Sequence, residues 1–317
     1  MILNILLLII GLALVVGGAN FLTDGAASIA KRFRLSDLVI GLTVLAFGTS
    51  APELTVSLMA ALKGSADIAI GNVIGSNIFN ILAIVGITAL IMPLTMSNST
   101  IRIEIPLTIL SSAVLFFMAN DRLFDMAGEN VITRTEGFVL LAFFLIFLFY
   151  TFNMSKGEES PGQVRQFALP LSIIMVIGGL VALVFGGDLF VDNAAMLAGR
   201  MGVSESVVAI TIVAGGTSLP ELVTTLVAAI KKRPGMAIGN IVGSNLFNIL
   251  LILGVSSSIS PIRIQGITVV DYGIFILSAI LLYVFGLFFG DKTIKRFEGS
   301  ILLSLFICYT VYLVMTA

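Results

Sequence analysis

Apolar residues run through this chain in long stretches, and polar residues gather in short breaks between them. Cutting at charge clusters and at Pro, Gly, Asn and Ser breaks leaves ten apolar segments, at residues 2–30, 37–62, 67–92, 101–119, 132–154, 167–199, 203–230, 235–258, 267–289 and 294–315. Runs of about 20 apolar residues match the thickness of a membrane. Because hydrocarbon offers the backbone no hydrogen-bond partners, each segment is predicted to be a transmembrane α-helix.

The ten segments divide into two groups of five around one long polar connector, SKGEESPGQVRQ at residues 155–166. The sequence therefore predicts an all-α polytopic membrane protein with ten transmembrane helices. Its parts are a first five-helix repeat (1–154), a linker (155–166) and a second five-helix repeat (167–317).

The two halves share a repeated stretch in their second and third segments. Residues 41–82 align without a gap with residues 209–250, an offset of 168, and 23 of the 42 pairs are identical. Of these identities, 13 fall on Gly, Thr, Ser, Pro, Glu, Lys or Asn, so polar chemistry is what is repeated. Because each half has an odd number of segments, the second copy must cross the membrane in the opposite direction, which makes the repeats inverted.

Charge and composition set the orientation and exclude several classes of function. Placing the N-terminus outside puts 12 of the 17 Lys and Arg residues, and the 155–166 linker, on the cytoplasmic side, as the positive-inside rule requires. A net charge of −1 does not indicate the basic surface that nucleic-acid binding requires. The absence of His excludes imidazole metal sites, and the single Cys308 excludes a disulfide framework. Residues 1–30 lack the pattern of a cleaved signal and are predicted to be a first span.

A proline lies near the middle of the second and seventh segments, Pro52 in GTSAPEL and Pro220 in GTSLPEL. Proline removes one backbone donor and displaces the carbonyl four residues earlier. Each segment is therefore predicted to break there and to free carbonyl oxygens at residues 46–49 and 214–217. Irregular backbone at that depth is tolerated only where it is buried or lines a cavity.

A glutamate directly follows each proline, Glu53 in one half and Glu221 in the other. An ionised side chain near the membrane centre costs at least ~2.5 to 3.5 kcal/mol on insertion scales, so the pair implies a partner of opposite charge. No Lys or Arg lies at comparable depth in either repeat. The predicted partner is therefore a cation that binds and leaves.

The third and eighth segments each carry three polar residues spaced by four, on one helix face: Asn72, Ser76 and Asn80, and Asn240, Ser244 and Asn248. Together with the carboxylates, these oxygens suit hard cations such as Ca²⁺ and Na⁺ rather than zinc or copper. Taken singly, a proline in a membrane helix is usually a kink, and Gly, Ser or Asn usually serves helix packing. The Pro–Glu pair in both halves is what indicates ion binding.

The motifs GTSAPE with GNVIGSNIFN, and GTSLPE with GNIVGSNLFN, resemble the signatures of the sodium/calcium exchanger family, prokaryotic type, within the cation/calcium antiporter superfamily. The resemblance covers essentially the whole chain. It implies that Glu53 and Glu221 chelate Ca²⁺. The further ion ligands that it implies are Thr49, Ser50, Thr217 and Ser218, the backbone oxygens of Ala46 and Ala214, Ser76 and Ser244 at outer sodium positions, and Asn80 and Asn248 at the centre.

Two departures from relatives matter. Some relatives, including potassium-dependent ones, carry Asp where this chain has Asn248. With two carboxylates, the site is neutral when it holds one Ca²⁺, which weakens the case for K⁺ co-transport. The 155–166 linker is too short to hold the Ca²⁺-sensing domain of animal exchangers, which excludes regulation by such a domain.

The predicted function is a secondary antiporter of the cell membrane that moves Ca²⁺ against Na⁺ by alternating access, with no cofactor and no enzymatic activity. The first and sixth segments, long and interrupted by Gly, are the predicted moving gate. A Ca²⁺/H⁺ antiporter is the alternative, because protons could replace Ca²⁺ at both glutamates. A cation channel is disfavoured because polarity is concentrated at the midplane, and an intramembrane enzyme because a nucleophile–base pair is missing. The sequence leaves the oligomeric state open, and a monomer is sufficient for this function.

Overall fold

The computed structural model describes residues 2–124, 126, 128–153, 165–201, 214–289 and 291–316. Within them, eight helical stretches are long and apolar enough to cross a membrane: Ile2–Phe33, Ala66–Ile91, Thr100–Met118, Arg134–Asn153, Leu169–Arg200, Pro234–Ile259, Val269–Phe288 and Arg296–Thr316. A ninth is the bent pair Asp37–Thr49 and Ala51–Leu62, whose parts meet at 49°. For the tenth expected span, residues 203–213 lie outside the described ranges, as do residues 155–164 of the linker.

The described elements of the two halves share a similar order, although η3 and α8 of the first half have no counterpart among the described elements of the second. The first half contains α1 (Ile2–Phe33), α2 (Asp37–Ile40), η1 (Gly41–Leu45), α3 (Ala46–Thr49), α4 (Ala51–Leu62), α5 (Ala66–Ile78), η2 (Phe79–Val85), α6 (Gly86–Ile91), β1 (Leu94–Thr95), η3 (Thr100–Glu104), α7 (Ile105–Met118), α8 (Asp121–Phe124), β2 (Asn130–Ile132) and α9 (Arg134–Asn153). The second contains α10 (Leu169–Arg200), α12 (Ala214–Gly216), α13 (Leu219–Ile230), α14 (Pro234–Leu246), η5 (Phe247–Leu253), α15 (Gly254–Ile259), β3 (Ile262–Ile264), α16 (Val269–Phe288), β4 (Thr293–Ile294) and α17 (Arg296–Thr316). The η elements are π-helical turns.

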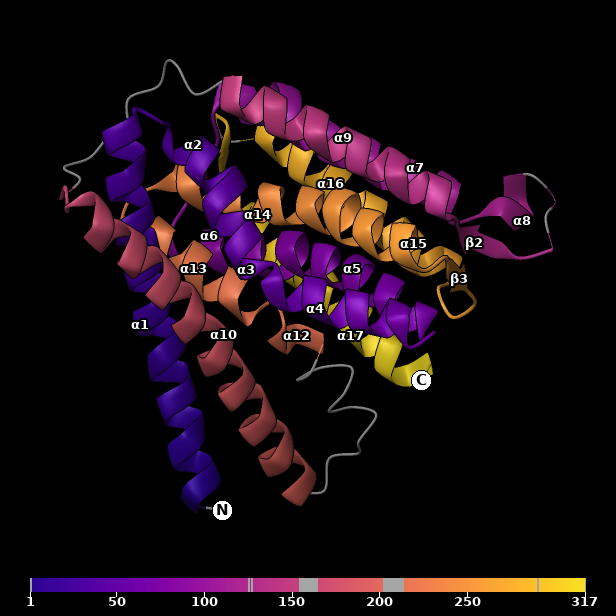
Figure 1. The fold of residues 1–317 in the computed structure, drawn as a ribbon, viewed down its shortest axis with the longest axis horizontal. Helices are drawn as coiled ribbons and strands as arrows, with labels where there is room; N and C mark the ends of the chain where they lie inside the picture. Colours follow the sequence, from indigo (N-terminus) through magenta and orange to yellow (C-terminus); the bar gives the residue numbers. More distant parts are fainter. Residues whose placement is uncertain are drawn as a thin grey trace.

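The longest helices, α1 and α10, lie side by side as an antiparallel pair and cross the direction of α7, α9 and α16 steeply (Figure 1). Glycines bring their backbones into contact. A Cβ added at Gly18 would lie 2.7 Å from the Gly179 carbonyl oxygen, and one added at Gly11 would lie 2.8 Å from that of Gly186. Such close approach increases the van der Waals contact that holds the two helices together, since the hydrophobic effect does not do so within lipid. The pair also packs on α13.

The most buried helical stretches are the third and eighth segments. The most apolar window of Pro234–Ile259 is 89% buried and that of Ala66–Ile91 is 72% buried. Glycines allow α14 to pack closely against the second segment. A Cβ added at Gly239 would lie 2.7 Å from the Leu38 carbonyl oxygen, and a Cβ added at Gly41 would lie 2.6 Å from the Met236 carbonyl oxygen. The third and eighth segments are also the ones that carry the polar residues spaced by four.

The predicted helical architecture holds, and in addition short strands pair between the loops. β1 pairs antiparallel with β4, with Leu94 opposite Ile294, and β2 pairs antiparallel with β3, with Val131 opposite Arg263. Each pair joins one strand from the first half to one from the second. The loop backbones thereby satisfy hydrogen-bonding groups that the helices leave over.

Candidate functional site

The second segment breaks where the proline predicts. α3 ends at Thr49, Ser50 leaves helical geometry with φ −82° and ψ 8°, and Pro52 lies in the first turn of α4. Ser218, with φ −90° and ψ 9°, precedes Pro220 in the same way at the start of α13. A proline is tolerated in a first turn because its missing N–H has no partner there.

The two helix breaks bring the hydroxyl and carboxylate side chains of both halves close to one another. Both glutamates lie in the first turn of their helix, where the helix dipole favours negative charge. Thr217 is half-buried between α12 and α13, and Ala214 begins α12. The Ala46 carbonyl is not freed as expected, since it accepts a hydrogen bond from the Ser50 amide at 3.0 Å. A carbonyl oxygen has a second lone pair, so this bond leaves it able to contact an ion.

The two halves exchange hydrogen bonds at their carboxylates. The Ser50 hydroxyl donates to Glu221 Oε1 at 3.0 Å, and the Ser218 hydroxyl donates to Glu53 Oε1 at the same distance. Both carboxylates are buried, with Glu53 0% and Glu221 1% exposed. In each, Oε2 has no hydrogen-bond partner among the described residues. The site thus holds two buried carboxylate oxygens without a hydrogen-bond partner in the part of the chain that the structure describes.

Asparagines at the start of each stripe fix the helices that carry the glutamates. Asn72 Nδ2 donates to the Glu53 carbonyl at 3.2 Å and to Ser57 Oγ at 2.9 Å. In the other half, Asn240 Nδ2 donates to the Glu221 carbonyl at 3.4 Å and to Thr225 Oγ1 at 3.1 Å. These matching bonds hold α4 to α5 and α13 to α14.

Thr49 and Ser76 complete the contacts around the carboxylates. The Thr49 hydroxyl donates to Asn240 Oδ1 at 3.2 Å, across the two halves. Ser76 Oγ approaches Glu53 Oε1 at 3.5 Å, whereas Ser244 Oγ is buried and has no hydrogen-bond partner among the described residues. Of the hydroxyls predicted from the sequence, those of Ser50, Ser218 and Ser76 therefore contact a carboxylate directly.

Four buried amides lie next along the third and eighth segments, each at most 1% exposed: Asn77, Asn80, Asn245 and Asn248. Asn80 Nδ2 donates to Asn245 Oδ1 at 3.0 Å. Neither polar atom of Asn248 has a hydrogen-bond partner in the described part of the chain. The sequence prediction included Asn80 and Asn248 but missed Asn77 and Asn245, although each follows a stripe serine in both copies of the GSN motif.

The unmatched atoms determine what the site can bind. Leaving a buried donor or acceptor without a partner costs about 1–3 kcal/mol each, and more for a charged group. A cation surrounded by oxygens would relieve that cost. Within the described ranges no group of three or more His, Cys, Asp or Glu side chains could hold a metal ion, so two carboxylates must act with hydroxyl, amide and backbone oxygens. That donor set suits Ca²⁺ and Na⁺.

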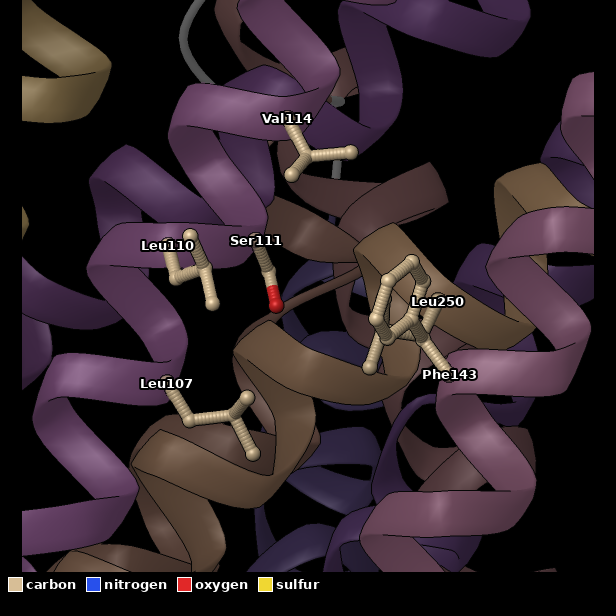
Figure 2. A pocket seen from close by; sticks show the side chains of 6 residues that line it. All are labelled: Leu107, Leu110, Ser111, Val114, Phe143 and Leu250. Atoms are coloured by element: carbon tan, nitrogen blue, oxygen red, sulfur yellow. The ribbon is translucent and has the colours of Figure 1, made fainter.

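A separate pocket between α7 and α9 has a different character. Figure 2 shows Leu107, Leu110 and Val114 on one side, Phe143 on another and Leu250 of η5 beside them. Ser111 is the one polar side chain that lines it. An apolar lining of this kind offers no shell for a cation, so the carboxylate pair is the candidate functional site.

Comparisons with known proteins identify the family of this chain. The profile of the family described as "Sodium/calcium exchanger protein" matches residues 3–153 and 171–315. The putative antiporter CaxA of Alkalimonas amylolytica is 36% identical over 312 residues, 95% of each chain. The sodium/calcium exchanger MaX1 of Methanosarcina acetivorans is 29% identical over 345 residues, 98% of each chain.

A solved structure of a sodium-calcium exchanger also matches this chain. The sodium-calcium exchanger NCX_Mj, in crystals soaked with zero Na⁺ and Ca²⁺, superimposes with a TM-score of 0.82 at 32% identity, over 98% of this chain and 99% of that one. Sequence and fold thus agree over nearly the full length. The chain belongs to the sodium/calcium exchanger family, whose members are membrane transporters.

Proposed function

We propose that this protein is a Na⁺/Ca²⁺ antiporter whose transported ions bind between Glu53 and Glu221. The observation that carries the proposal is the reciprocal pair of hydrogen bonds from Ser50 to Glu221 and from Ser218 to Glu53, each 3.0 Å. Both Oε2 atoms are left without a hydrogen-bond partner among the described residues. The names of the relatives MaX1 and NCX_Mj, both called sodium/calcium exchangers, support it.

Charge balance explains why the two ions would exchange. Two ionised carboxylates give the site a charge of −2, which one Ca²⁺ or two Na⁺ can neutralise. Because an uncompensated buried charge is costly, the site favours being loaded with one set of ions or the other. Ca²⁺ needs 6–8 oxygens, and we assign them to Glu53, Glu221 and the neighbouring hydroxyl, amide and carbonyl oxygens.

We further propose ten spans, arranged as two inverted five-helix repeats with boundaries at 1–154, 155–166 and 167–317. Equivalent contacts at an offset of 168 residues support this. The π-helical turns η2 and η5, Phe79–Val85 and Phe247–Leu253, occupy the same place in each half. The N-terminus would face outward and the linker the cytoplasm, in the cell membrane, as the distribution of Lys and Arg favours.

Alternating access would come from movement of the α1–α10 pair against the other helices. An asymmetry at its two ends supports this. Lys231 Nζ lies 2.7 Å from Asp24 Oδ1 and ties α1 to the end of α13. The equivalent residues at an offset of 168, Lys63 and Asp192, are both exposed and form no ion pair among the described residues. Within the described ranges, an ion pair thus ties the α1–α10 pair to the other helices at one of these two equivalent positions and not at the other.

A Ca²⁺/H⁺ antiporter is the second candidate, because two carboxylates can release Ca²⁺ by taking up two protons. The relative CaxA is named only as a putative antiporter, which leaves its coupling ion open. Na⁺ is favoured by the hydroxyl and amide oxygens around the carboxylates, which protons do not need.

Radiolabelled Ca²⁺ uptake into liposomes that contain the purified protein tests the proposal. Outward gradients of Na⁺, K⁺ or H⁺ are imposed one at a time, with the membrane potential clamped by an ionophore. A Na⁺ gradient alone should drive uptake. Uptake driven by H⁺ and indifferent to Na⁺ would establish the second candidate instead.

A further inference from the structure

A single hydrogen bond links the central amides of the two halves. Asn80, in η2, donates from Nδ2 to Oδ1 of Asn245, in α14, at 3.0 Å. Both side chains are 1% exposed. The contact joins residues 165 positions apart, so it forms only when the halves pack together.

This bond determines which atom Asn80 can offer to an ion. Its nitrogen is engaged by Asn245, and its oxygen has no hydrogen-bond partner among the described residues. An amide binds a hard cation through oxygen, whereas its N–H₂ group repels one. Asn245 therefore holds Asn80 in the orientation that presents the oxygen.

The equivalent pair in the other half lacks this bond. An offset of 168 residues relates Asn80 to Asn248 and Asn245 to Asn77. All four polar atoms of Asn77 and Asn248 are buried without a hydrogen-bond partner in the described ranges. Nothing in the described part of the chain holds the Asn248 nitrogen away from the site.

We propose that Asn245 and Asn77 are positioning residues, each of which accepts the amide nitrogen of the central Asn of the opposite half and leaves its oxygen for the transported cation. The inference rests on the proposed function, because it assigns Asn80 and Asn248 to the ion shell. The Asn245 contact is formed in this structure. The Asn77 contact forms when an ion draws the Asn248 oxygen toward the carboxylates.

Asn77→Leu gives the sharpest test, because Leu keeps the branching at Cγ and the Asn77 side chain makes no hydrogen bond within the described ranges. A purely structural role predicts no loss of function, since an apolar side chain suits a buried site better than an unpartnered amide. A positioning role predicts that the KM for Ca²⁺ rises about threefold to tenfold, the value of one hydrogen bond, while kcat changes less than twofold.

A double-mutant cycle shows whether the effect passes through Asn248. Asn77→Leu should weaken Ca²⁺ binding in the unmutated protein and have no further effect in the Asn248→Leu background. The same cycle applies to Asn245→Leu and Asn80→Leu. Ser256→Ala, which removes another buried and unpartnered polar atom of the eighth segment, is the control and should leave the KM unchanged.

Equilibrium binding of ⁴⁵Ca²⁺ to the purified full chain gives the same comparison without transport, so the result does not depend on which ion is coupled. Additive effects of the two substitutions, or an unchanged KM in Asn77→Leu and Asn245→Leu, would overturn the positioning role. An unmutated protein that binds Ca²⁺ but fails to exchange it for Na⁺ would instead contradict the proposed function.

Discussion

At the scale of single residues, the buried carboxylates are of two kinds. Asp271 accepts bonds from the Thr268 amide and hydroxyl, each at 2.7 Å, and from the Tyr309 hydroxyl at 2.7 Å. Its partners are supplied by the protein, as expected for a helix cap. In Glu53 and Glu221, by contrast, Oε2 has no hydrogen-bond partner among the described residues, which leaves that oxygen able to bind a cation.

Replacing Glu53 or Glu221 with Gln keeps the size of the side chain and removes one of the two charges. We expect Ca²⁺ affinity to fall at least about 100-fold in either variant, since breaking a buried charge pair costs roughly 3–5 kcal/mol. Equilibrium ⁴⁵Ca²⁺ binding measures this. Glu129→Gln changes an exposed carboxylate and should bind as the unmutated protein does. Near-normal binding by both site variants would exclude the proposed site.

The neutral Asn248 predicts independence from K⁺. Because one Ca²⁺ balances Glu53 and Glu221, exchange should run in Na⁺ media free of K⁺. Asn248→Asp adds a third buried acid, which needs a proton or a further cation to be neutral. The variant should therefore depend on pH or on an added monovalent ion, as measured by ⁴⁵Ca²⁺ flux. A strict K⁺ requirement in the unmutated protein would show that this charge balance is wrong.

At the scale of elements, neighbouring glycines of α10 have opposite surroundings. A Cβ on Gly179 would lie 2.6 Å from the Leu22 amide nitrogen of α1, whereas one on Gly178 would meet nothing within 4 Å. Backbone contact of this kind fixes the spacing of the α1–α10 pair. Two helices that move as a unit need such an interface, because the hydrophobic effect does not drive helices together within lipid and close packing must do so instead.

Gly179→Ala should force α1 and α10 apart. Overpacking of a well-packed interface costs about 1–3 kcal/mol, so we expect a lower melting temperature in detergent and slower transport. Gly178→Ala is the matched control, one residue away and turned about 100° around the helix. Its change in stability should stay within about 1 kcal/mol. Equal stability and transport in the two variants would show that the α1–α10 contact is not required.

At the scale of the whole molecule, the proposed inverted repeat would place two equivalent loops on opposite sides of the membrane. Lys63 and Lys232 lie exposed at the ends of α4 and α13. In a Cys308→Ala background, Lys63→Cys and Lys232→Cys should react with an impermeant thiol reagent from opposite sides of intact cells or inverted vesicles. Labelling of both from the same side would rule out the inverted repeat.

Much of the fold follows from the sequence because the bilayer imposes a length and an apolar composition on every span. The break beside Pro52 and the two glutamates were predictable for a similar reason, since a backbone break and a buried charge are costly in lipid. The hydrogen bonds from Ser50 to Glu221 and from Ser218 to Glu53 were not predictable. They join residues 165 or more positions apart, and such contacts leave no local pattern in the sequence.

The same limit explains what sequence analysis missed. Asn77 and Asn245 are one residue off the polar stripe, so helical spacing alone does not assign them to the site. The strand pairs between loops of the two halves depend on tertiary packing as well. Each becomes visible only when the two halves are placed together.

The most direct test of the central claim is anomalous diffraction from crystals soaked with Sr²⁺ as a stand-in for Ca²⁺. One strong peak should lie between Glu53 and Glu221, within about 2.8 Å of carboxylate oxygens of both, a limit slightly above the Ca²⁺–oxygen range. The peak should disappear in Glu221→Gln crystals. A peak bound elsewhere, or one that survives that substitution unchanged, would contradict the account.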